Sequence, residues 1–375
     1  MSKSIIVLGG GMVGSAIAVD LHKEFNVTVA DVNSDRLNKL QSDKTIKTIQ
    51  KDLSDADTVK EIVKDFDLVI GAVPGFMGYK TLHSVIDASK DVVDISFFSE
   101  DPFELDELAK EKNVTAVVDC GVSPGLSNII LGFHNRKMKI ESYKCYVGGL
   151  PFKRELPFQY KAFFSPIDVI EEYVRPARIV ENGKVIIKEA LSEPEIIEFE
   201  KVGKLEAFNT DGLRTLITTM KIPDMIEKTL RYPGHIALMK VFREAGFFSD
   251  KEIEINGNKI KPVELTAKLL FPFWKPEENE DEFTILRIII EGTENGEKIK
   301  YTYNLFDKFD NKLSTSSMAR TTGYTCTSAA RLLLNGSFKR KGISPPEFIG
   351  ETPGCFEKVI GDLSNRNIKI NVRSI

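Results

Sequence analysis

A glycine-rich turn close to the N-terminus constrains the fold of this chain more than any other feature. The hexapeptide GGGMVG at positions 9–14 follows the apolar run Ile5–Leu8 and precedes a segment with the apolar spacing of a helix. Glycines in the pattern G-x-G-x-x-G allow a tight turn, a close approach of the backbone to a pyrophosphate, and close packing of the helix on the strand. The helix offers unpaired N–H groups and the positive end of its dipole to the phosphates. The motif predicts a dinucleotide-binding α/β fold.

Short apolar runs alternate with amphipathic segments from the N-terminus to about residue 120. This alternation predicts a parallel sheet covered by helices on both faces, with right-handed crossovers. Six strands of this kind match a Rossmann domain made of two mononucleotide-binding halves. The expected strands are Ile5–Leu8, Val27–Ala30, Ile46–Ile49, Leu68–Gly71, Val92–Ile95 and Val114–Val118.

The pattern changes after Ile140, where longer alternating strands are joined by tight turns. Asn-Gly occurs at 182–183, 256–257 and 295–296, and this dipeptide accepts the positive φ angles of a type I′ hairpin turn. We therefore expect a second α+β domain with a mixed or antiparallel sheet. The C-terminal elements should be a helix of small residues over Ser317–Leu334, a helix near Gly354–Asn365 and a strand at Ile368–Val372.

The composition excludes several classes of protein. The chain has 51 Lys and Arg against 55 Asp and Glu, a formal net charge of −4, which argues against binding to nucleic acid or to an anionic membrane surface. The four Cys residues form no CxxC pair, so we expect neither a metal site nor a disulfide scaffold, and we expect a cytoplasmic location. The sequence contains no run of about 18 apolar residues, so we expect no membrane span.

An acidic residue closes the second expected strand, where a carboxylate can accept a hydrogen bond from a ribose 2′-hydroxyl. Asp31 would repel a 2′-phosphate, which favours NAD over NADP, although Arg36 could soften that preference. The segments after the third and fourth strands lie where ligands bind in open α/β sheets, with ordinary turns as an equal alternative. The residues predicted to hold the cofactor are Gly9, Gly11, Met12, Val13, Gly14, Asp31, Asp52, Gly71, Ala72, Val73 and Pro74.

Polar residues at the ends of the fifth and sixth strands are candidates for the reaction centre. Asp94 and Asp119 should point toward the reactive end of the cofactor. Cys120 follows Asp119, but no basic residue nearby in the sequence would activate its thiol. We therefore expect a buried core cysteine rather than a nucleophile.

Dense polar clusters in the second domain supply further candidates. Asp211 and Arg214 lie in TDGLR, and Arg231 and His235 lie in LRYPGH. An Arg fork can bind a carboxylate with two parallel hydrogen bonds, and a His can move a proton near neutral pH. The structural alternatives are an Asp211–Arg214 pair across one helical turn and a core histidine at 235.

Several motifs, taken in order, resemble those of the saccharopine dehydrogenase-like proteins, and within them the NAD-dependent L-lysine 6-dehydrogenases. The resemblance implies an N-terminal Rossmann domain, a catalytic domain whose sheet helps to form a homodimer, and C-terminal helices that return to the Rossmann domain. We accordingly expect a discontinuous nucleotide domain at 1–125 and 317–375 and a catalytic domain at 126–316. The motifs span essentially the whole chain and are VLGGGMVGSAIA, DLVIGAVPGFMG, VVDISF, DCGVSPGLSN, YVGGLP, EEYVRPARIVENGK, TDGLRTL, KTLRYPGH and SMARTTGYT.

The reaction implied by this resemblance is an NAD-dependent oxidation of the CH–NH2 or CH–NH group of lysine or a lysine derivative. L-Lysine would lose hydride from Cε to the nicotinamide, and the hydrolysed product would be a semialdehyde that cyclises to piperideine-6-carboxylate. The alternatives are a saccharopine dehydrogenase, acting on the C–N bond of saccharopine, a more distant carboxynorspermidine-type reductase, and a nucleotide-binding redox sensor without turnover. The expected roles are His235 as base, Arg214 or Arg231 as carboxylate clamp, and Asp94, Asp119 or Asp211 as partner of the α-ammonium.

Overall fold

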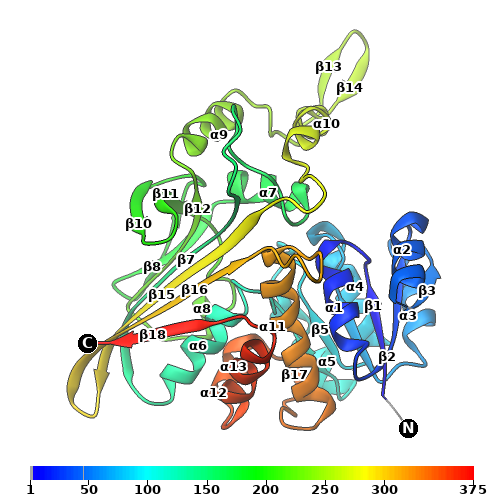
Figure 1. Ribbon diagram of the computed structural model, residues 1–375, viewed down its shortest axis with the longest axis horizontal. Coiled ribbons are helices and arrows are strands. Elements are labelled where there is room, and N and C mark those ends of the chain that lie inside the picture. Colours follow the sequence, from blue (N-terminus) through cyan, green and yellow to red (C-terminus); the bar gives the residue numbers. More distant parts are fainter. Residues whose placement is uncertain (1–2, 45) are drawn as a thin grey trace. The chain divides into compact units, whose positions relative to one another are not determined.

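The computed structural model describes residues 3–44 and 46–375, which divide into two compact units. Unit 1 comprises Met1–Met138 and Met318–Lys369, and unit 2 comprises Lys139–Ser317 and Ile370–Ile375. Each unit is described by itself below, with the element labels of Figure 1. Unit 1 is discontinuous in sequence, because the chain returns to it after unit 2.

Unit 1 contains an all-parallel sheet, which in the described residues has seven strands in the order β17-β6-β5-β4-β1-β2-β3. The strand order reverses between β1 and β4, which defines the switch point where open α/β sheets bind ligands. The six expected strands are confirmed, and the two-residue strand β17 extends the sheet beside β6. The strands are β1 (Ser4–Leu8), β2 (Asn26–Asp31), β3 (Lys47–Gln50), β4 (Leu68–Gly71), β5 (Val92–Asp94), β6 (Thr115–Val117) and β17 (Gly342–Ile343).

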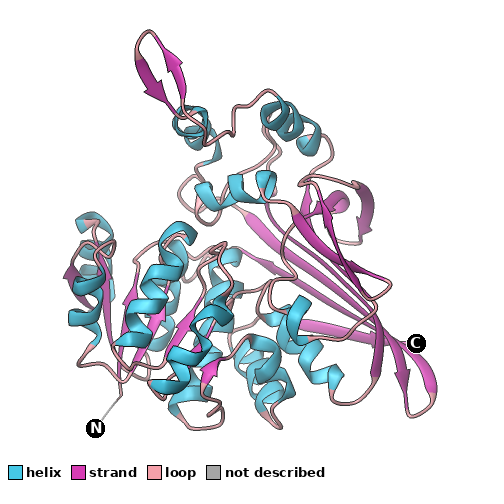
Figure 2. Cartoon of the chain, turned by 180° about the vertical axis from the view of Figure 1, so that it is seen from behind, coloured by secondary structure: helices cyan, strands magenta, loops and turns pink. Residues whose placement is uncertain are grey.

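The strands at the centre of this sheet are apolar on both faces because helices cover both. Ile5, Ile6, Val7 and Leu8 of β1 are all fully buried, as expected for a doubly covered parallel strand. Figure 2 shows the helices flanking these strands. The helices of unit 1 are α1 (Met12–Leu21), α2 (Ser34–Lys44), α3 (Ala56–Val63), α4 (Gly75–Asp87), η1 (Pro102–Leu105), α5 (Asp106–Glu111), α6 (Leu126–Asn135), α11 (Ser317–Leu334), α12 (Pro346–Glu351) and α13 (Cys355–Asn365).

Glycines at helix crossings explain why the units divide after Met138 rather than after residue 125. A Cβ on Gly132 of α6 would lie 2.0 Å from the carbonyl oxygen of Glu347, and a Cβ on Gly350 of α12 would lie 2.0 Å from that of Ile129. Helices α6 and α12 therefore cross with their backbones in contact, and α6 belongs to unit 1. At the other end of the chain, β18 (Ile370–Ser374) pairs with β16 and belongs to unit 2.

Unit 2 contains a mixed sheet, as the sequence predicts. Its described strands run in the order β10-β11-β12-β7-β15-β16-β18, with β8 on β12 and β9 on β8. Strands β12 and β7 are parallel, and the other pairs are antiparallel. The strands are β7 (Lys139–Pro151), β8 (Ala177–Glu181), β9 (Lys184–Lys188), β10 (Glu195–Phe199), β11 (Gly203–Asn209), β12 (Asp224–Arg231), β15 (Glu282–Glu294) and β16 (Glu297–Lys308), with a separate hairpin of β13 (Ile253–Ile255) and β14 (Asn258–Ile260).

The three Asn-Gly turns close hairpins at β8–β9, β13–β14 and β15–β16. Asn182, Asn256 and Asn295 have φ angles of 49°, 51° and 52°, and each following glycine also has a positive φ. These are the angles of the type I′ turn, whose twist matches that of the flanking strands. The remaining helices of unit 2 are α7 (Pro166–Val174), α8 (Leu216–Thr219), α9 (His235–Glu244) and α10 (Pro262–Trp274).

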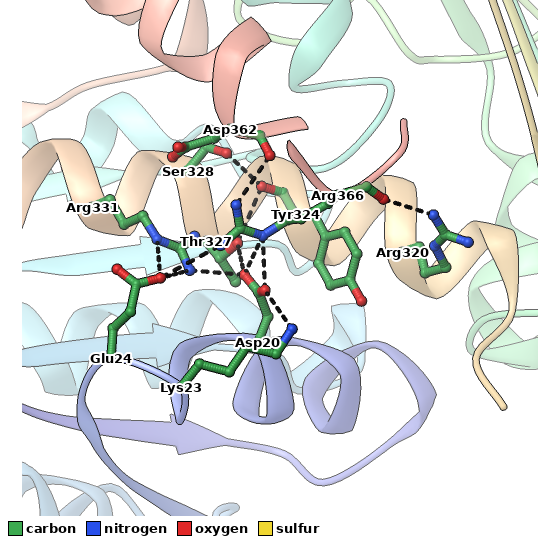
Figure 3. A network of polar contacts seen from close by, with 10 residues as sticks. All are labelled: Asp20, Lys23, Glu24, Arg320, Tyr324, Thr327, Ser328, Arg331, Asp362 and Arg366. Atoms are coloured by element: carbon green, nitrogen blue, oxygen red, sulfur yellow. Dashed lines mark hydrogen bonds and ion pairs between the residues drawn. The ribbon is translucent and has the colours of Figure 1, made fainter. Parts of the chain in front are cut away.

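A buried carboxylate on α1 joins this helix to α11 and α13 (Figure 3). Asp20 is 1% exposed and accepts hydrogen bonds from Thr327 at 2.8 Å, from Arg331 at 3.0 Å and from Arg366 at 2.7 Å. Burial alone would raise the pKa of Asp20, but the hydrogen bond from Arg366 and the charges of both guanidinium groups outweigh it and lower the pKa. Gly323 of α11 adds a close approach, since its Cβ would lie 3.1 Å from Ile17 of α1.

Replacing Asp20 tests how much this network stabilises the fold. Asp20→Asn removes the charge that two guanidinium groups share, and we expect the free energy of unfolding to fall by about 3 kcal/mol. Glu24→Gln removes an exposed partner of the same Arg331, and we expect a loss below about 1 kcal/mol. Urea unfolding of both variants measures the difference, and equal losses would show that Asp20 is not the centre of the network.

Candidate functional site

The glycine-rich turn has the geometry that its sequence requires. Gly9 has a φ of 111° and donates its N–H to the Ala30 carbonyl at 2.8 Å. A Cβ on Gly9 would lie 2.3 Å from the Ala72 carbonyl oxygen, and a Cβ on Gly14 would lie 2.0 Å from the Gly9 carbonyl oxygen. A Cβ on Gly11, by contrast, would meet no heavy atom within 4 Å. Two glycines thus allow the turn itself, and Gly11 leaves open space beside it.

The N-terminus of α1 is open to an anion. Gly11 is the N-cap residue and provides no side-chain hydrogen bond, and the first turn of the helix holds no acidic residue. Its first N–H groups and the positive end of the helix dipole are therefore available to a phosphate. Met12, the first residue of the helix, is 45% exposed.

Asp31 connects the end of β2 to the glycine-rich turn. Its carboxylate accepts the Gly10 N–H at 2.6 Å and the Asn33 N–H at 2.8 Å, and the residue is 6% exposed. Each carboxylate oxygen has a second lone pair, so a ribose hydroxyl can still bind. Arg36 places a guanidinium nitrogen 3.8 Å from the same carboxylate.

The other predicted cofactor residues divide into two groups. Gly71 ends β4 at the switch point, Ala72, Val73 and Pro74 follow it, and Pro74 is the N-cap of α4. Asp52 is exposed and accepts the Ser54 N–H at 2.9 Å, and this hydrogen bond lowers its pKa. The carboxylate of Asp52 therefore stabilises its own turn, which is the structural alternative for this residue.

Asp94 and Asp119 lie at the carboxyl ends of neighbouring strands, close to Cys120. Asp94 is fully buried and accepts hydrogen bonds from the N–H and hydroxyl of Ser96 at 2.8 and 3.2 Å. A Cβ on Gly71 would lie 1.9 Å from the Asp94 carboxylate, so only glycine fits there. Asp119 is 2% exposed and has a φ of 53°, an unusual angle for a residue other than glycine.

Cys120 is a core cysteine, as the sequence predicts. The residue is fully buried, and burial followed by the charges of Asp119 and Asp94 raises the pKa of its thiol far above the ordinary value. A thiol that stays protonated is a poor nucleophile.

Arg231 of unit 2 is occupied by contacts within the protein. Its Nε donates to the Tyr173 hydroxyl at 3.1 Å, its Nη1 to the Leu230 carbonyl at 3.0 Å and its Nη2 to the Glu172 carboxylate at 2.6 Å. The guanidinium lies over the Tyr160 ring, 4.4 Å from the centroid, and the residue is 2% exposed. Arg231 is therefore a poor candidate for a substrate clamp.

His235 is a satisfied core histidine in this structure. Its Nδ1 lies 2.8 Å from the Phe158 carbonyl, which can only accept, so Nδ1 carries the proton. Its Nε2 then accepts from the Tyr173 hydroxyl at 2.9 Å. Burial, with the charge of Arg231, lowers the pKa of His235 to about 3. With both nitrogens engaged and the ring 1% exposed, the geometry does not favour His235 as the catalytic base.

Asp211 and Arg214 do not pair across a helical turn, because residues 210–214 form no helix. Asp211 instead binds the Arg178 guanidinium in a bidentate pair with both distances at 2.8 Å. Arg214 is 5% exposed with a φ of 49°. Burial and the charge of Arg214 lower the pKa of Arg175, which also pairs with the Glu171 carboxylate at 3.5 Å. Two guanidinium groups whose charges interact in this way favour the binding of an anion.

Glu227 is a candidate that the sequence did not reveal. This carboxyl on β12 is 3% exposed and accepts the Thr210 hydroxyl at 2.5 Å. Burial raises its pKa to about 8, and the charges of Glu172 and Asp211 add to the effect. A Cβ on Gly212 would lie 2.2 Å from this carboxylate. The TDG motif thus has glycine at position 212 because the Glu227 side chain, 15 residues further along the chain, leaves no room for a Cβ there.

The described part of the chain contains no group of three or more His, Cys, Asp and Glu residues placed to hold a metal ion. No helix among residues 3–44 and 46–375 is long and apolar enough to cross a membrane.

Two family models together match most of the chain. The saccharopine dehydrogenase NADP binding domain matches residues 5–117, and the saccharopine dehydrogenase C-terminal domain matches residues 118–368.

Curated relatives carry related names. The saccharopine dehydrogenase (NADP(+), L-glutamate-forming) of Pyricularia oryzae is 27% identical over 316 residues, which cover 80% of this chain and 70% of the relative. The protein of the same name from Saccharomyces cerevisiae is 26% identical over 68% of this chain and 60% of the relative. The mitochondrial α-aminoadipic semialdehyde synthase of Rattus norvegicus is 29% identical over 49% of this chain, but the match spans only 21% of that protein.

Solved structures share the fold. The apo saccharopine dehydrogenase (L-Glu forming) from Saccharomyces cerevisiae matches with a TM-score of 0.79 and 21% identity, and the match covers 100% of both chains. The homospermidine synthase of Legionella pneumophila, solved with NAD, matches with a TM-score of 0.68 and 13% identity over 100% of this chain and 92% of that one. The predicted fold class is thereby confirmed.

The protonation of His235 can be tested by titration. We expect its ring to stay neutral from pH 8 to pH 5, whereas an ordinary His protonates near pH 6.5. In the unfolded chain His235 binds a proton near pH 6.5, whereas in the folded chain it binds one only when the pH falls to about 3. Stability is therefore complete above pH 6.5 and decreases as the pH is lowered.

The ring signals of His235 in NMR, with urea unfolding at pH 7.5 and 5.0, measure this effect. We expect His235→Gln to lose part of the pH dependence, and His83→Gln, at an exposed position, to retain it. A His235 ring that titrates between pH 6 and 7 would restore the histidine as a candidate base.

Proposed function

The chain belongs to the saccharopine dehydrogenase family of NAD(P)-dependent amino-acid dehydrogenases, and we propose that it oxidises the C–N bond of saccharopine or a close lysine-derived secondary amine. The observation that carries this proposal is the family match, which runs from residue 5 to residue 368 and includes both units. The names of the relatives favour saccharopine over lysine itself, so the lysine 6-dehydrogenase hypothesis becomes the second candidate.

The nucleotide fits the turn after β1. The open space at Gly11 accepts a pyrophosphate, and the free N–H groups of α1 bind it. Asp31, held by the Gly10 N–H, accepts from a ribose hydroxyl. When bound, the nicotinamide accepts a hydride from the carbon that carries the substrate nitrogen.

The choice of coenzyme depends on the balance between Asp31 and Arg36. The buried carboxylate of Asp31 repels a 2′-phosphate, which supports NAD. Two observations support some use of NADP. The Arg36 guanidinium lies 3.8 Å from the Asp31 carboxylate and could bind a phosphate, and the names of the relatives include NADP. We infer that NAD is preferred and that NADP is accepted.

We assign the carboxylate clamp to Arg214 with Arg175. Saccharopine joins lysine to a glutamate unit through one secondary nitrogen, so it carries two more carboxylates than lysine does, and the guanidinium groups of Arg214 and Arg175 suit that charge. Asp94 and Asp119 remain the proposed partners of an α-ammonium.

Glu227 takes the place of His235 as the proposed proton acceptor. A substrate amine must lose its proton before its carbon can release hydride, and a base is most effective when its pKa lies near the working pH. Burial raises the pKa of Glu227 to about 8, which places its ionisation in that range. Thr210 holds the carboxylate by a hydrogen bond of 2.5 Å.

A coenzyme-reduction assay tests this function. Purified protein is incubated with NAD or NADP and with saccharopine, L-lysine, L-ornithine or a diamine, and absorbance at the reduced-nicotinamide band is followed. We expect turnover with saccharopine and NAD, and slower turnover with NADP. Turnover of lysine alone would replace saccharopine by the second candidate, and coenzyme binding without turnover of any amine would indicate a redox sensor.

Two variants separate the proposed roles in the same assay. Arg214→Lys should raise KM for saccharopine by about tenfold, the cost of roughly 1.4 kcal/mol of lost bidentate binding. Glu227→Gln should remove the rise of kcat/KM as the pH passes through about 8, because the ionised carboxylate is the active form. A Glu227→Gln enzyme with the wild-type pH profile would refute the assignment of the base.

A further inference from the structure

A hollow with charged residues in its lining lies between α11 and α13 of unit 1, separate from the candidate nucleotide turn. Its volume is about 310 Å³, and its lining includes Arg331, Asn335, Lys358, Gly361, Asp362 and Asn365. This volume is at the lower end of the range of small-molecule sites, about 300–1,000 Å³. Asp362 and Arg331 of the lining also belong to the network of Figure 3.

Arg331 has a buried N–H group that its protein contacts do not satisfy. The residue is 9% exposed, and its Nε and Nη2 donate to Glu24 and Asp20. Its Nη1 is buried and has no hydrogen-bond partner within residues 3–44 and 46–375. A charged donor left without a partner is destabilising, so an acceptor bound in the hollow would be favoured.

The charges around the hollow leave one cation in excess. Arg331 and Lys358 line it with Asp362, and the ion pairs of Arg331 bring in Asp20 and Glu24, to which Lys23 and Arg366 also bind. Four cations (Lys23, Arg331, Lys358, Arg366) thus face three carboxylates (Asp20, Glu24, Asp362). Lys358 donates to a neutral group, the Ser337 hydroxyl, at 2.7 Å. A ligand with one net negative charge would restore the balance.

We propose that this hollow binds an acidic α-amino acid. One carboxylate binds Arg331 Nη1, the other binds Lys358, and the ammonium binds Asp362. Asn335 and Asn365 supply amide groups that can donate or accept at the rim of the hollow. The ligand has one ammonium and two carboxylates, which matches one acid and two cations in the lining.

The site is connected to α1 through Arg331. This guanidinium holds Asp20 and Glu24, both near the C-terminal end of α1, and the N-terminal end of the same helix carries the glycine-rich turn. Binding at Nη1 therefore changes the charge balance of a contact that positions α1. Any influence on coenzyme affinity would be reciprocal, so that the coenzyme would change the affinity for the amino acid by the same factor.

Gly361 offers a variant that fills the hollow without disturbing the fold. The residue lies on the exposed side of α13, and a Cβ there would meet no heavy atom within 4 Å. Gly361 lines the hollow, so Gly361→Leu places a side chain there, and Gly361→Ala is the matched control, which also favours the helix. Lys358→Glu, at an exposed position, reverses one of the two lining charges.

The test is an NMR titration of the side-chain amide signals of Asn335 and Asn365 with L-glutamate, in the absence of coenzyme. We expect saturable shifts in the wild type and in Gly361→Ala, and an affinity at least tenfold weaker in Gly361→Leu and Lys358→Glu. Glutarate, which lacks the ammonium, and L-norvaline, which lacks the second carboxylate, should also bind at least tenfold more weakly.

The proposal stands or falls independently of the dehydrogenase function, because no turnover is measured. Arg214→Ala should leave the shifts unchanged if they report the hollow and not the substrate site. The proposal is overturned if L-glutamate produces no saturable shift, if Gly361→Leu binds as Gly361→Ala does, or if glutarate binds as tightly as L-glutamate.

Discussion

The hydrogen bond from the Gly10 N–H to the Asp31 carboxylate, 2.6 Å long, is the contact on which the candidate nucleotide site depends. It ties the turn after β1 to the end of β2, and it fixes both groups that a dinucleotide would meet, the α1 N-terminus and an acid. The Asp31 carboxylate is buried where it makes this contact. Helix α1 is also fixed near its other end, where the Asp20 carboxylate accepts hydrogen bonds from Thr327, Arg331 and Arg366. Helix α1 thus connects the glycine-rich turn to the C-terminal helices of unit 1.

Unit 2 holds its polar residues in a different manner. A continuous chain of hydrogen bonds runs from the Phe158 carbonyl through His235, Tyr173 and Arg231 to Glu172. Every step is buried or partly buried, and removing one member would leave its neighbours without partners. This chain makes Arg231 and His235 structural residues and leaves Arg175, Arg214 and Glu227 as the groups on which the proposed chemistry rests.

Local patterns were sufficient to predict much of the fold. The strands of unit 1 are runs of buried apolar residues, and the Asn-Gly turns require positive φ angles, so both follow from a few adjacent residues. The helix Ser317–Leu334 was predicted with its bounds, and Gly323 explains its close packing. Strand β17 was missed because two residues carry no period. The assignment of α6 to unit 1 depends on Gly132 and Gly350, whose close contacts with Glu347 and Ile129 form only in the folded chain.

The candidate site was harder to predict than the fold, because a residue's role depends on partners far away in sequence. His235 has the sequence context of a base, and only the contacts with Phe158 and Tyr173, 77 and 62 residues away, identify it as a core residue. Asp211 lies three residues before Arg214, but it pairs with Arg178. Glu227 stands in an unremarkable strand sequence, and its raised pKa arises from burial against Thr210 and Gly212.

The most direct test of the central claim is the affinity of Gly11→Ala and Gly14→Ala for NADH, measured by fluorescence together with the melting temperature. Gly11 faces open space, whereas a Cβ on Gly14 would lie 2.0 Å from the Gly9 carbonyl. The account predicts that Gly11→Ala keeps the wild-type melting temperature but binds NADH at least tenfold more weakly, and that Gly14→Ala loses stability. A Gly11→Ala protein with unchanged affinity for NADH would contradict the assignment of this turn as the pyrophosphate site.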